Sequence, residues 1–225
     1  MKTDRTFRNP KNIKSAIKLL HAVTTELSSR NIQYYLDFGT LIGAMRNNSF
    51  IPWDYDIDIS LKNETDYKQI PEILKIISKK YNYRTYIYTF NEMAKRREKK
   101  GSPTKEMIPP FTSKENYQIA KIRTNKFLFF GKGHLCLDIF FKYNYNNFSY
   151  WYAYGRVNRT SQKTLGDTLI PFSFYGYNFF IPKNYDKYLS EVYGDWKTEK
   201  ENWTNENGSK SAENIESIIN KGELL

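Results

Sequence analysis

The sequence predicts an α+β fold built on a mixed β-sheet. Two observations lead to this prediction: helix-like and strand-like segments alternate early in the chain, and from residue 83 onward apolar side chains recur at every second position. Of the 225 residues, 40% are hydrophobic and 17% are aromatic, which is enough to bury a sizeable core. We therefore expect residues 1–225 to form a single domain that ends in a polar tail at 197–225.

The first part of the chain predicts three helices and one strand. Apolar residues follow helical spacing over residues 10–30, and residues 32–38, IQYYLDF, have the composition of a strand. A short helix is expected over 40–48, with Thr40 at its N-terminal end, and a longer one over 70–81. The strand and the short helix would therefore meet in the turn FGT.

Strand-like alternation dominates the rest of the chain. The expected strands cover residues 83–90, 117–124, 134–143, 148–154 and 169–182, the last of which is a hairpin. The hairpin turn is expected near Gly176. Residues 183–196 return to a helical pattern, with Gly194 as the stop signal.

The formal charge of +11 and the isoelectric point near 9.4 indicate attraction to polyanions. Nucleic acid, an anionic membrane surface and phosphorylated small molecules all fit, and charge alone does not choose among them. The densest basic run, AKRREKKGSPTK at 94–105, contains glycine and proline, and it predicts a solvated surface loop in preference to a binding element.

Several classes of protein are disfavoured. The chain has one cysteine, Cys136, and two histidines, His21 and His134, so an internal disulfide is excluded and a zinc site is not expected. No apolar run has the length of a signal peptide or of a membrane span, which predicts a cytoplasmic protein. Nucleophile elbows and Walker-type loops are missing from the sequence.

The stretch FIPWDYDIDIS, at residues 50–60, is the feature that most directly suggests chemistry. Strand side chains alternate between faces, so Asp56 and Asp58 would emerge side by side while Ile57 and Ile59 point the other way. Two carboxylates about 6 Å apart repel by about 3 kcal/mol at an effective dielectric of about 20. A divalent cation, with magnesium the best match to hard oxygen ligands, would remove this repulsion. The alternative is an exposed acidic strand face after a turn at Asp54.

Two further features fit a phosphate site. The turn at Gly39 and Thr40 offers backbone amides, a hydroxyl and the positive end of a helix dipole to a phosphate. Asp138 lies in the apolar strand HLCLDIFF, where an unpaired charge would be costly. It is therefore expected to be a third metal ligand or a general base; the alternative is a buried salt bridge to Lys121 or Arg123.

The run DFGTLIGAMRNNSFIPWDYDIDIS resembles the signature of the LicD family, which includes the fukutin-like proteins and is related to the nucleotidyltransferase fold. The core of the resemblance is residues 36–60, with later matches in LDIFF and in IPKNYDKYLSEVYGDW. The matched signature residues are Gly39, Thr40, Leu41, Gly43, Arg46, Phe50, Pro52, Trp53, Asp54, Asp56 and Asp58. One departure is Tyr55, where family members often carry a further aspartate. The resemblance implies a nucleotidyltransferase-like mixed sheet flanked by helices, with additional C-terminal strands and a helix.

The resemblance also implies an activity: transfer of a phosphorylated headgroup from a cytidine diphosphate donor to a glycan hydroxyl. Phosphocholine from CDP-choline, or ribitol phosphate from CDP-ribitol, would be transferred to a glycan such as lipopolysaccharide, capsule or teichoic acid. Asp56, Asp58 and Asp138 would be the catalytic residues and would hold Mg²⁺, with Mn²⁺ as an alternative. Substrate contacts are implied for Gly39, Thr40, Gly43, Arg46, Trp53, Lys121 and Arg123.

Three other expectations remain open. A choline headgroup would need an aromatic cage, which YWYAY at 150–154 could supply unless that segment is a core strand. The competing functions are a nucleotidyltransferase that uses a nucleoside triphosphate and a non-catalytic polyanion-binding protein. The basic charge would suit peripheral contact with an anionic membrane that carries a lipid-linked glycan acceptor, whereas nucleic acid is not the expected partner.

Overall fold

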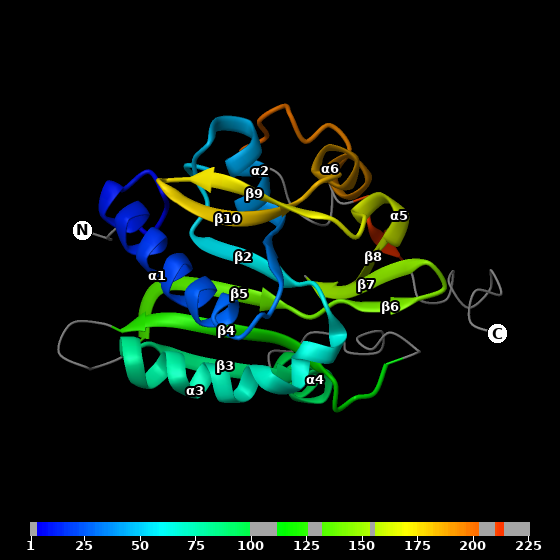
Figure 1. The fold of residues 1–225 in the computed structure, drawn as a ribbon, viewed down its shortest axis with the longest axis horizontal. Coiled ribbons are helices and arrows are strands. Elements are labelled where there is room, and N and C mark those ends of the chain that lie inside the picture. The colour runs from blue at the N-terminus through cyan, green and yellow to red at the C-terminus, as the bar shows by residue number, and fades with distance from the viewer. Residues whose placement is uncertain (1–3, 100–111, 126–131, 154–155, 203–209, 214–225) are drawn as a thin grey trace. The chain divides into compact units, whose positions relative to one another are not determined.

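The computed structural model describes residues 4–99, 112–125, 132–153, 156–202 and 210–213 (Figure 1). The chain divides into two compact units. The first comprises Met1–Ile87, Ala120–Phe140 and Leu169–Ile181, and the second comprises Tyr88–Ile119, Phe141–Thr168 and Pro182–Leu225. Each unit has its own buried core. That the chain forms a single domain stays a prediction.

A five-stranded mixed sheet, most of whose residues belong to the first unit, confirms the predicted α+β class. Its strands follow the order β1 (Tyr34–Leu36), β2 (Asp56–Leu61), β5 (Lys132–Phe140), β4 (Tyr117–Asn125) and β3 (Arg84–Thr89). β1 is antiparallel to β2, and β2 is parallel to β5. A parallel pair needs a long crossover. The chain provides it between the end of β2 at Leu61 and the start of β5 at Lys132.

Two helices of the first unit match their predictions closely. α1 (Pro10–Ser28) begins with a proline, and the Asn9 side chain accepts a hydrogen bond from the backbone N–H of Lys11. α3 (Ile70–Tyr81) follows the 3-10 turn η1 (Glu64–Gln69). In the described part of the chain, no helix is both long enough and apolar enough to cross a membrane.

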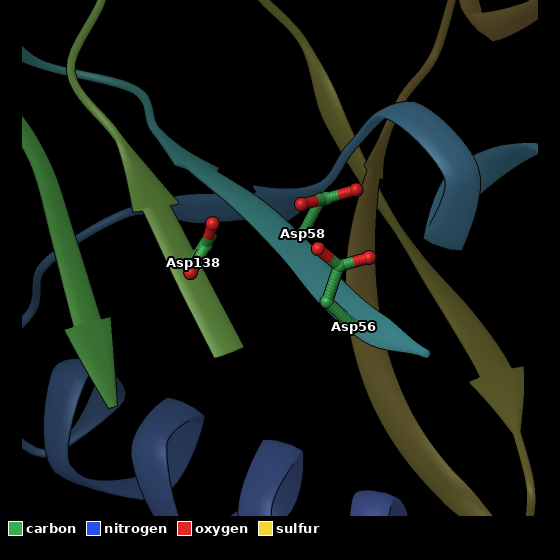
Figure 2. Close-up of side chains that lie close together, drawn as sticks. All are labelled: Asp56, Asp58 and Asp138. Carbon is green, nitrogen blue, oxygen red and sulfur yellow. The ribbon is translucent and has the colours of Figure 1, made fainter. Parts of the chain in front are cut away.

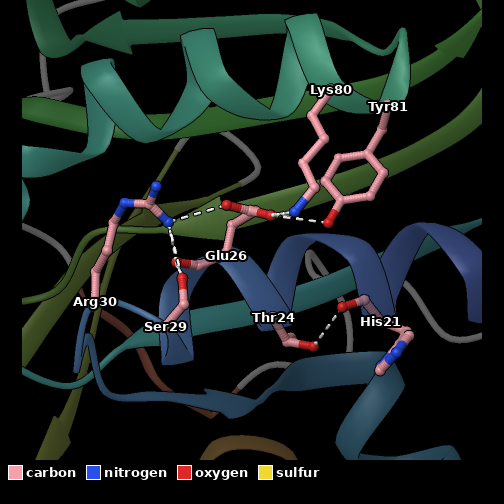
Figure 3. Close-up of polar contacts among 7 residues, drawn as sticks. All are labelled: His21, Thr24, Glu26, Ser29, Arg30, Lys80 and Tyr81. Atoms are coloured by element: carbon pink, nitrogen blue, oxygen red, sulfur yellow. Dashed lines mark hydrogen bonds and ion pairs between the residues drawn. The ribbon is translucent and has the colours of Figure 1, made fainter.

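A buried carboxylate links α1 to α3 (Figure 3). Glu26 of α1 is 4% exposed and accepts hydrogen bonds from Lys80 Nζ at 2.7 Å and from the Tyr81 hydroxyl at 2.8 Å. Arg30 donates to the other carboxylate oxygen at 2.9 Å. The hydrogen bond from Lys80 is the main reason that the pKa of Glu26 lies below its usual range, because it outweighs the effect of burial.

α2 (Phe38–Asn47) begins two residues earlier than predicted. The residue before the helix is Asp37, whose carboxylate accepts the backbone N–H of Phe38 at 2.8 Å. Thr40, which the sequence suggested as the start, therefore lies within the first turn. The error arose because both residue types favour helix starts and only the structure shows which one caps.

The remaining part of the first unit is the predicted hairpin. β9 (Leu169–Phe174) and β10 (Tyr177–Pro182) form a two-stranded sheet, and the chain turns at Tyr175 and Gly176, which both have positive φ angles of 50° and 82°. The predicted turn near Gly176 is therefore confirmed. Pro182 is the last residue of β10 and belongs to the second unit.

The second unit contains a four-stranded sheet in the order β11 (Ala212–Glu213), β8 (Arg156–Ser161), β7 (Phe148–Ala153) and β6 (Tyr143–Tyr145). It also contains α5 (Gln162–Leu165) and α6 (Tyr185–Tyr193), which ends at Gly194 as predicted. Tyr150, Trp151 and Tyr152 are at most 3% exposed. These residues of β7 therefore form core, which is the alternative to an aromatic cage that the sequence offered for this segment.

One prediction in the second unit fails outright. Residues 94–98, expected to be loop, belong to α4 (Phe90–Glu98). The helix starts with a capping box: Thr89 accepts the backbone N–H of Glu92, and the Glu92 carboxylate accepts the backbone N–H of Thr89. The basic composition of the segment concealed this start signal. The rest of the predicted loop, from residue 100, lies outside the described residues.

We expect Glu26→Gln to destabilise the protein by about 1–3 kcal/mol at neutral pH, because Lys80 and Arg30 lose their charged partner. A lowered pKa means that the stabilisation by Glu26 is present above the usual carboxyl pKa of 4.5 and is lost as the pH falls through the folded-state value. Urea unfolding at neutral and acidic pH measures both effects.

Glu72→Gln is the matched control, because Glu72 is an exposed carboxylate that pairs with Lys75 on the surface of α3. Its effect should stay within about 0.5 kcal/mol. Equal unfolding free energies for the two variants would contradict the structural role of Glu26.

Candidate active site

The register of β2 and β5 brings three carboxylates together, as Figure 2 shows. Asp58 lies directly beside Asp138 on the parallel strand, and Asp56 lies beside Cys136. Ile57 and Ile59 have no exposed surface, so the alternation predicted for β2 is confirmed. The buried isoleucines fix which face of the strand carries the carboxylates.

The three carboxyl groups are close enough to share a cation. Asp56, Asp58 and Asp138 each offer an oxygen, and these oxygens lie within 4.8 Å of one another. Ligands on opposite sides of a divalent cation are separated by about 4–5 Å. Three hard oxygen donors at this spacing fit Mg²⁺ or Mn²⁺ better than a softer metal.

The electrostatics of the cluster point the same way. Burial and the charges of Asp54 and Asp138 raise the pKa of Asp56 to about 8. Burial, followed by the charges of Asp56 and Asp138, raises the pKa of Asp58 well above its usual value. Asp56 and Asp58 therefore hold protons strongly unless a cation compensates their charge.

Asp138 has partners on both sides: the salt bridge to Lys121 is present, and its role as metal ligand or general base stays a prediction. It belongs to the carboxylate cluster, and its Oδ2 also forms an ion pair with Lys121 of β4. Its Oδ1 accepts a hydrogen bond from the thiol of Cys136 at 3.0 Å. Burial and the charge of Asp138 raise the pKa of Cys136, which keeps the thiol protonated as a donor. Lys121 and Cys136 thus orient the Asp138 carboxylate.

The first turn of α2 holds Asp58 in place. The Thr40 hydroxyl accepts the backbone N–H of Asp58 at 2.9 Å, and Thr40 is 2% exposed. The backbone N–H of Asp37 donates to the carbonyl of Asp58, and the Asp37 carboxylate accepts the hydroxyl of Ser60 on the same strand. Thr40 therefore has a positioning role in the structure, and direct contact between Thr40 and a phosphate stays a prediction.

Asp54 is the residue that the sequence analysis undervalued. It was assigned to the turn before β2, but its carboxylate lies against α2: a Cβ added at Gly39 would lie 2.5 Å from Asp54 Oδ2 and 3.9 Å from Asp58 Oδ2. Burial raises the pKa of Asp54 despite the hydrogen bonds that it accepts. The signal was available, because Asp54 continues the alternate spacing of Asp56 and Asp58.

The other residues predicted to contact substrate lie on several different elements. Gly43 is buried, and a Cβ there would lie 2.3 Å from the carbonyl oxygen of Ser49, which gives this glycine a packing role. Arg46 is in the last turn of α2, Trp53 is in the turn before β2, and both are half-buried. Arg123 follows Lys121 on the same face of β4. Substrate binding by these residues stays a prediction.

Comparison with known proteins identifies the family. The family model described as LicD/FKTN/FKRP, nucleotidyltransferase domain, matches residues 31–184. This range includes β1, α2, β2 and β5, and so all three carboxylates of the cluster. The chain belongs to the LicD/FKTN/FKRP family, and the resemblance carried by residues 36–60 is confirmed.

Individual relatives are similar over short segments. The ribitol 5-phosphate transferase FKRP of Homo sapiens is 43% identical over 35 residues, which are 16% of this chain and 7% of that protein. The lipopolysaccharide cholinephosphotransferase LicD of Haemophilus influenzae is 45% identical over 42 residues, which are 19% of this chain and 16% of that protein. Each alignment covers less than a fifth of the relative.

Among solved structures, the lincomycin-bound lincosamide antibiotic adenylyltransferase LnuA aligns with a TM-score of 0.42 and 12% sequence identity. The alignment covers 76% of this chain and 83% of that chain.

We expect Mg²⁺ or Mn²⁺ to stabilise the protein more strongly as the pH rises from about 6 to about 9. Without a cation, the contribution of Asp56 to stability is fully present below the usual carboxyl pKa of 3.8. Because the pKa of Asp56 is raised in the folded protein, this contribution is lost as the pH rises through about 8. Thermal unfolding with and without each cation should show a gain of a few degrees at the alkaline end.

Asp56→Asn should remove most of the cation effect and make the cation-free protein less sensitive to alkaline pH, because one of the repelling charges is gone. Glu72→Gln, which neutralises an exposed carboxylate, should behave like the parent protein. An unchanged cation effect in Asp56→Asn would contradict the assignment of this residue.

We expect Gly39→Ala to lower activity and to destabilise the protein by about 1–3 kcal/mol, because the added methyl group would lie only 2.5 Å from Asp54 Oδ2. The double variant Gly39→Ala/Asp54→Ala should recover part of the unfolding free energy, since the contact is relieved. If Gly39→Ala is as stable as the parent protein, the close approach of Asp54 to Gly39 does not require a glycine.

Proposed function

We propose that this protein transfers a phosphorylated headgroup from a cytidine diphosphate donor to a hydroxyl of a cell-surface glycan. The observation that carries the proposal is the convergence of Asp56, Asp58 and Asp138 within a domain of the LicD/FKTN/FKRP family. The names of two similar proteins, a lipopolysaccharide cholinephosphotransferase and a ribitol 5-phosphate transferase, support it. Phosphocholine from CDP-choline is our first choice of headgroup, and ribitol phosphate from CDP-ribitol is the alternative.

In this proposal Asp56, Asp58 and Asp138 hold Mg²⁺, with Mn²⁺ as an alternative. The donor set of three carboxylates and the raised pKa values of Asp56 and Asp58 support a divalent cation. When bound, the cation would neutralise charge on the donor pyrophosphate and polarise the phosphoryl oxygens.

The chain's own groups supply positioning and proton transfer. The backbone amides at the start of α2, next to Gly39, are suited to donate to phosphate oxygens, since this end of the helix carries a partial positive charge. Lys121 holds the Asp138 carboxylate, and Arg123 adds a second positive charge on the same strand face. Asp138 would either complete the metal site or accept the proton of the attacking hydroxyl.

Product analysis tests the proposal. The protein is incubated with Mg²⁺, an acceptor glycan and, in separate reactions, CDP-choline, CDP-ribitol or CTP. Release of CMP with transfer of the headgroup to the glycan is the expected result. Release of pyrophosphate from CTP would instead favour a nucleotidyltransferase. The family model's description as a nucleotidyltransferase domain makes this the second candidate.

We expect Asp58→Asn to lower kcat by about three orders of magnitude or more while the thermal midpoint is kept or raised. Glu72→Gln should leave kcat unchanged, because its carboxylate is on the surface of α3. Full turnover in Asp58→Asn would overturn the catalytic assignment.

The role of Asp138 follows from a second measurement on Asp138→Asn. A metal ligand would lose cation binding and turnover together. If Asp138 is a general base, Asp138→Asn would keep cation binding, but kcat would fall and the acidic limb of the pH profile would disappear.

A separate measurement tests the non-catalytic polyanion binder. This function would be favoured if the parent protein shows no turnover and if salt-sensitive binding of nucleic acid persists in Asp56→Asn/Asp58→Asn.

A further inference from the structure

One long face of α1 is not used in packing the first unit. After Pro10, the exposed residues of the helix recur at spacings of three and four: Lys11, Lys14, Lys18, His21, Thr25 and Ser28. At 3.6 residues per turn these positions form one continuous stripe along a helix about 28 Å long. The opposite side of the helix is buried, with no exposed surface at Leu19, Leu20, Val23 and Leu27.

The charge on this stripe is of one sign. The only acidic residue of α1 is Glu26, which is buried and bound to Lys80 and Tyr81 of α3. The lysines at 11 and 14 lie in the first half of the helix, where the helix dipole already presents its positive end. This position does not favour helix stability, so the lysines fit contact with an anion better than a structural role.

Two exposed aromatic side chains of the hairpin contact α1, one directly and one through Tyr34. Tyr177 and Phe180 of β10 are 40% and 38% exposed. The Tyr177 ring stacks on His21 of the stripe with centroids 4.1 Å apart. Phe180 meets the ring of Tyr34 at 5.8 Å, and the Tyr34 hydroxyl is hydrogen-bonded to Thr24 and Ser28 of α1. The hairpin therefore adds aromatic surface next to the C-terminal half of α1, which continues the stripe beyond its lysines.

We infer that Lys11, Lys14, Lys18, His21, Tyr177 and Phe180, together the α1 face, form a docking surface for an anionic membrane. Lysines attract acidic lipid headgroups, while aromatic side chains with one polar and one apolar side favour the boundary between headgroups and acyl chains. Duplex nucleic acid would use the lysines but would leave Phe180 without a role. The inference is independent of the proposed transferase activity.

Vesicle binding of the full chain tests the charged part of this surface. Lys14→Gln/Lys18→Gln should bind vesicles of phosphatidylcholine and phosphatidylglycerol about 30-fold more weakly than the parent protein, since each lysine near an anionic surface contributes about fivefold. The matched control is Lys75→Gln/Lys79→Gln, which removes the same charge from exposed positions on α3 and should change binding less than about twofold.

The aromatic part has a different signature. Tyr177→Ser/Phe180→Ser should weaken vesicle binding at every salt concentration and leave the dependence on salt unchanged, whereas the lysine variant should flatten that dependence. Tyr55→Ser removes a more exposed aromatic side chain, from the turn before β2, that is not part of the α1 face, and it should have no effect on vesicle binding. Thermal midpoints confirm that each variant is folded.

Three outcomes would overturn the inference. The first is equal loss of binding in the two lysine variants, which would assign binding to net charge. The second is equal binding to vesicles with and without phosphatidylglycerol. The third is tighter binding of single-stranded or duplex nucleic acid than of anionic vesicles, reduced by Lys14→Gln/Lys18→Gln and not by the control, which would assign the α1 face to nucleic acid.

Discussion

The mutual repulsion of buried carboxylates is the constraint that organises the first unit. At 4.8 Å, two carboxylates repel by roughly 3 kcal/mol at an effective dielectric of about 20. The strands cannot relieve this by moving, because Ile57 and Ile59, on the other face of β2, are fully buried and fix its register against β5. Relief must come from a proton or from a cation. The raised pKa values of Asp56 and Asp58 describe the first solution, and the proposed function relies on the second.

The groups around the cluster come from different elements, and each controls one carboxylate. Thr40 of α2 accepts the backbone N–H of Asp58, and Gly39 leaves room for Asp54. Lys121 of β4 and Cys136 of β5 each bond one oxygen of Asp138. The geometry of the site thus depends on how α2 and β4 pack against the two central strands. A change in that packing would alter the site without replacing any carboxylate.

Periodicity was sufficient to predict the parts of this arrangement that follow from the backbone alone. The alternation of Asp56, Ile57 and Asp58 identified both a strand and the face that its carboxylates share. The order of strands in a sheet is not written in such a pattern, so the sequence left Asp138 between a metal site and a salt bridge. The structure shows why: β5 lies between β2 and β4, and Asp138 contacts both neighbours. The closeness of Asp54 to α2 is likewise a tertiary contact. α4 is a different case, because its capping box is a local sequence signal that could have predicted the helix. The basic run that follows it led to the prediction of a loop instead.

The distribution of charge within the first unit explains how a basic protein can contain an acidic site. In the proposed function, the ionised carboxylates of Asp56 and Asp58 would repel the donor pyrophosphate and attract a divalent cation, so donor and cation would bind in a coupled manner. Each should raise the apparent affinity of the other by the same factor, because linkage is reciprocal. Further lysines beside Asp56 and Asp58 would compete with the cation for these carboxylates, whereas Lys121 bonds one oxygen of Asp138 and orients it. The exposed lysines of α1 lie on a helix face directed to solvent. In the proposed docking they would attract an anionic membrane from this face without neutralising the carboxylates that the proposed chemistry needs.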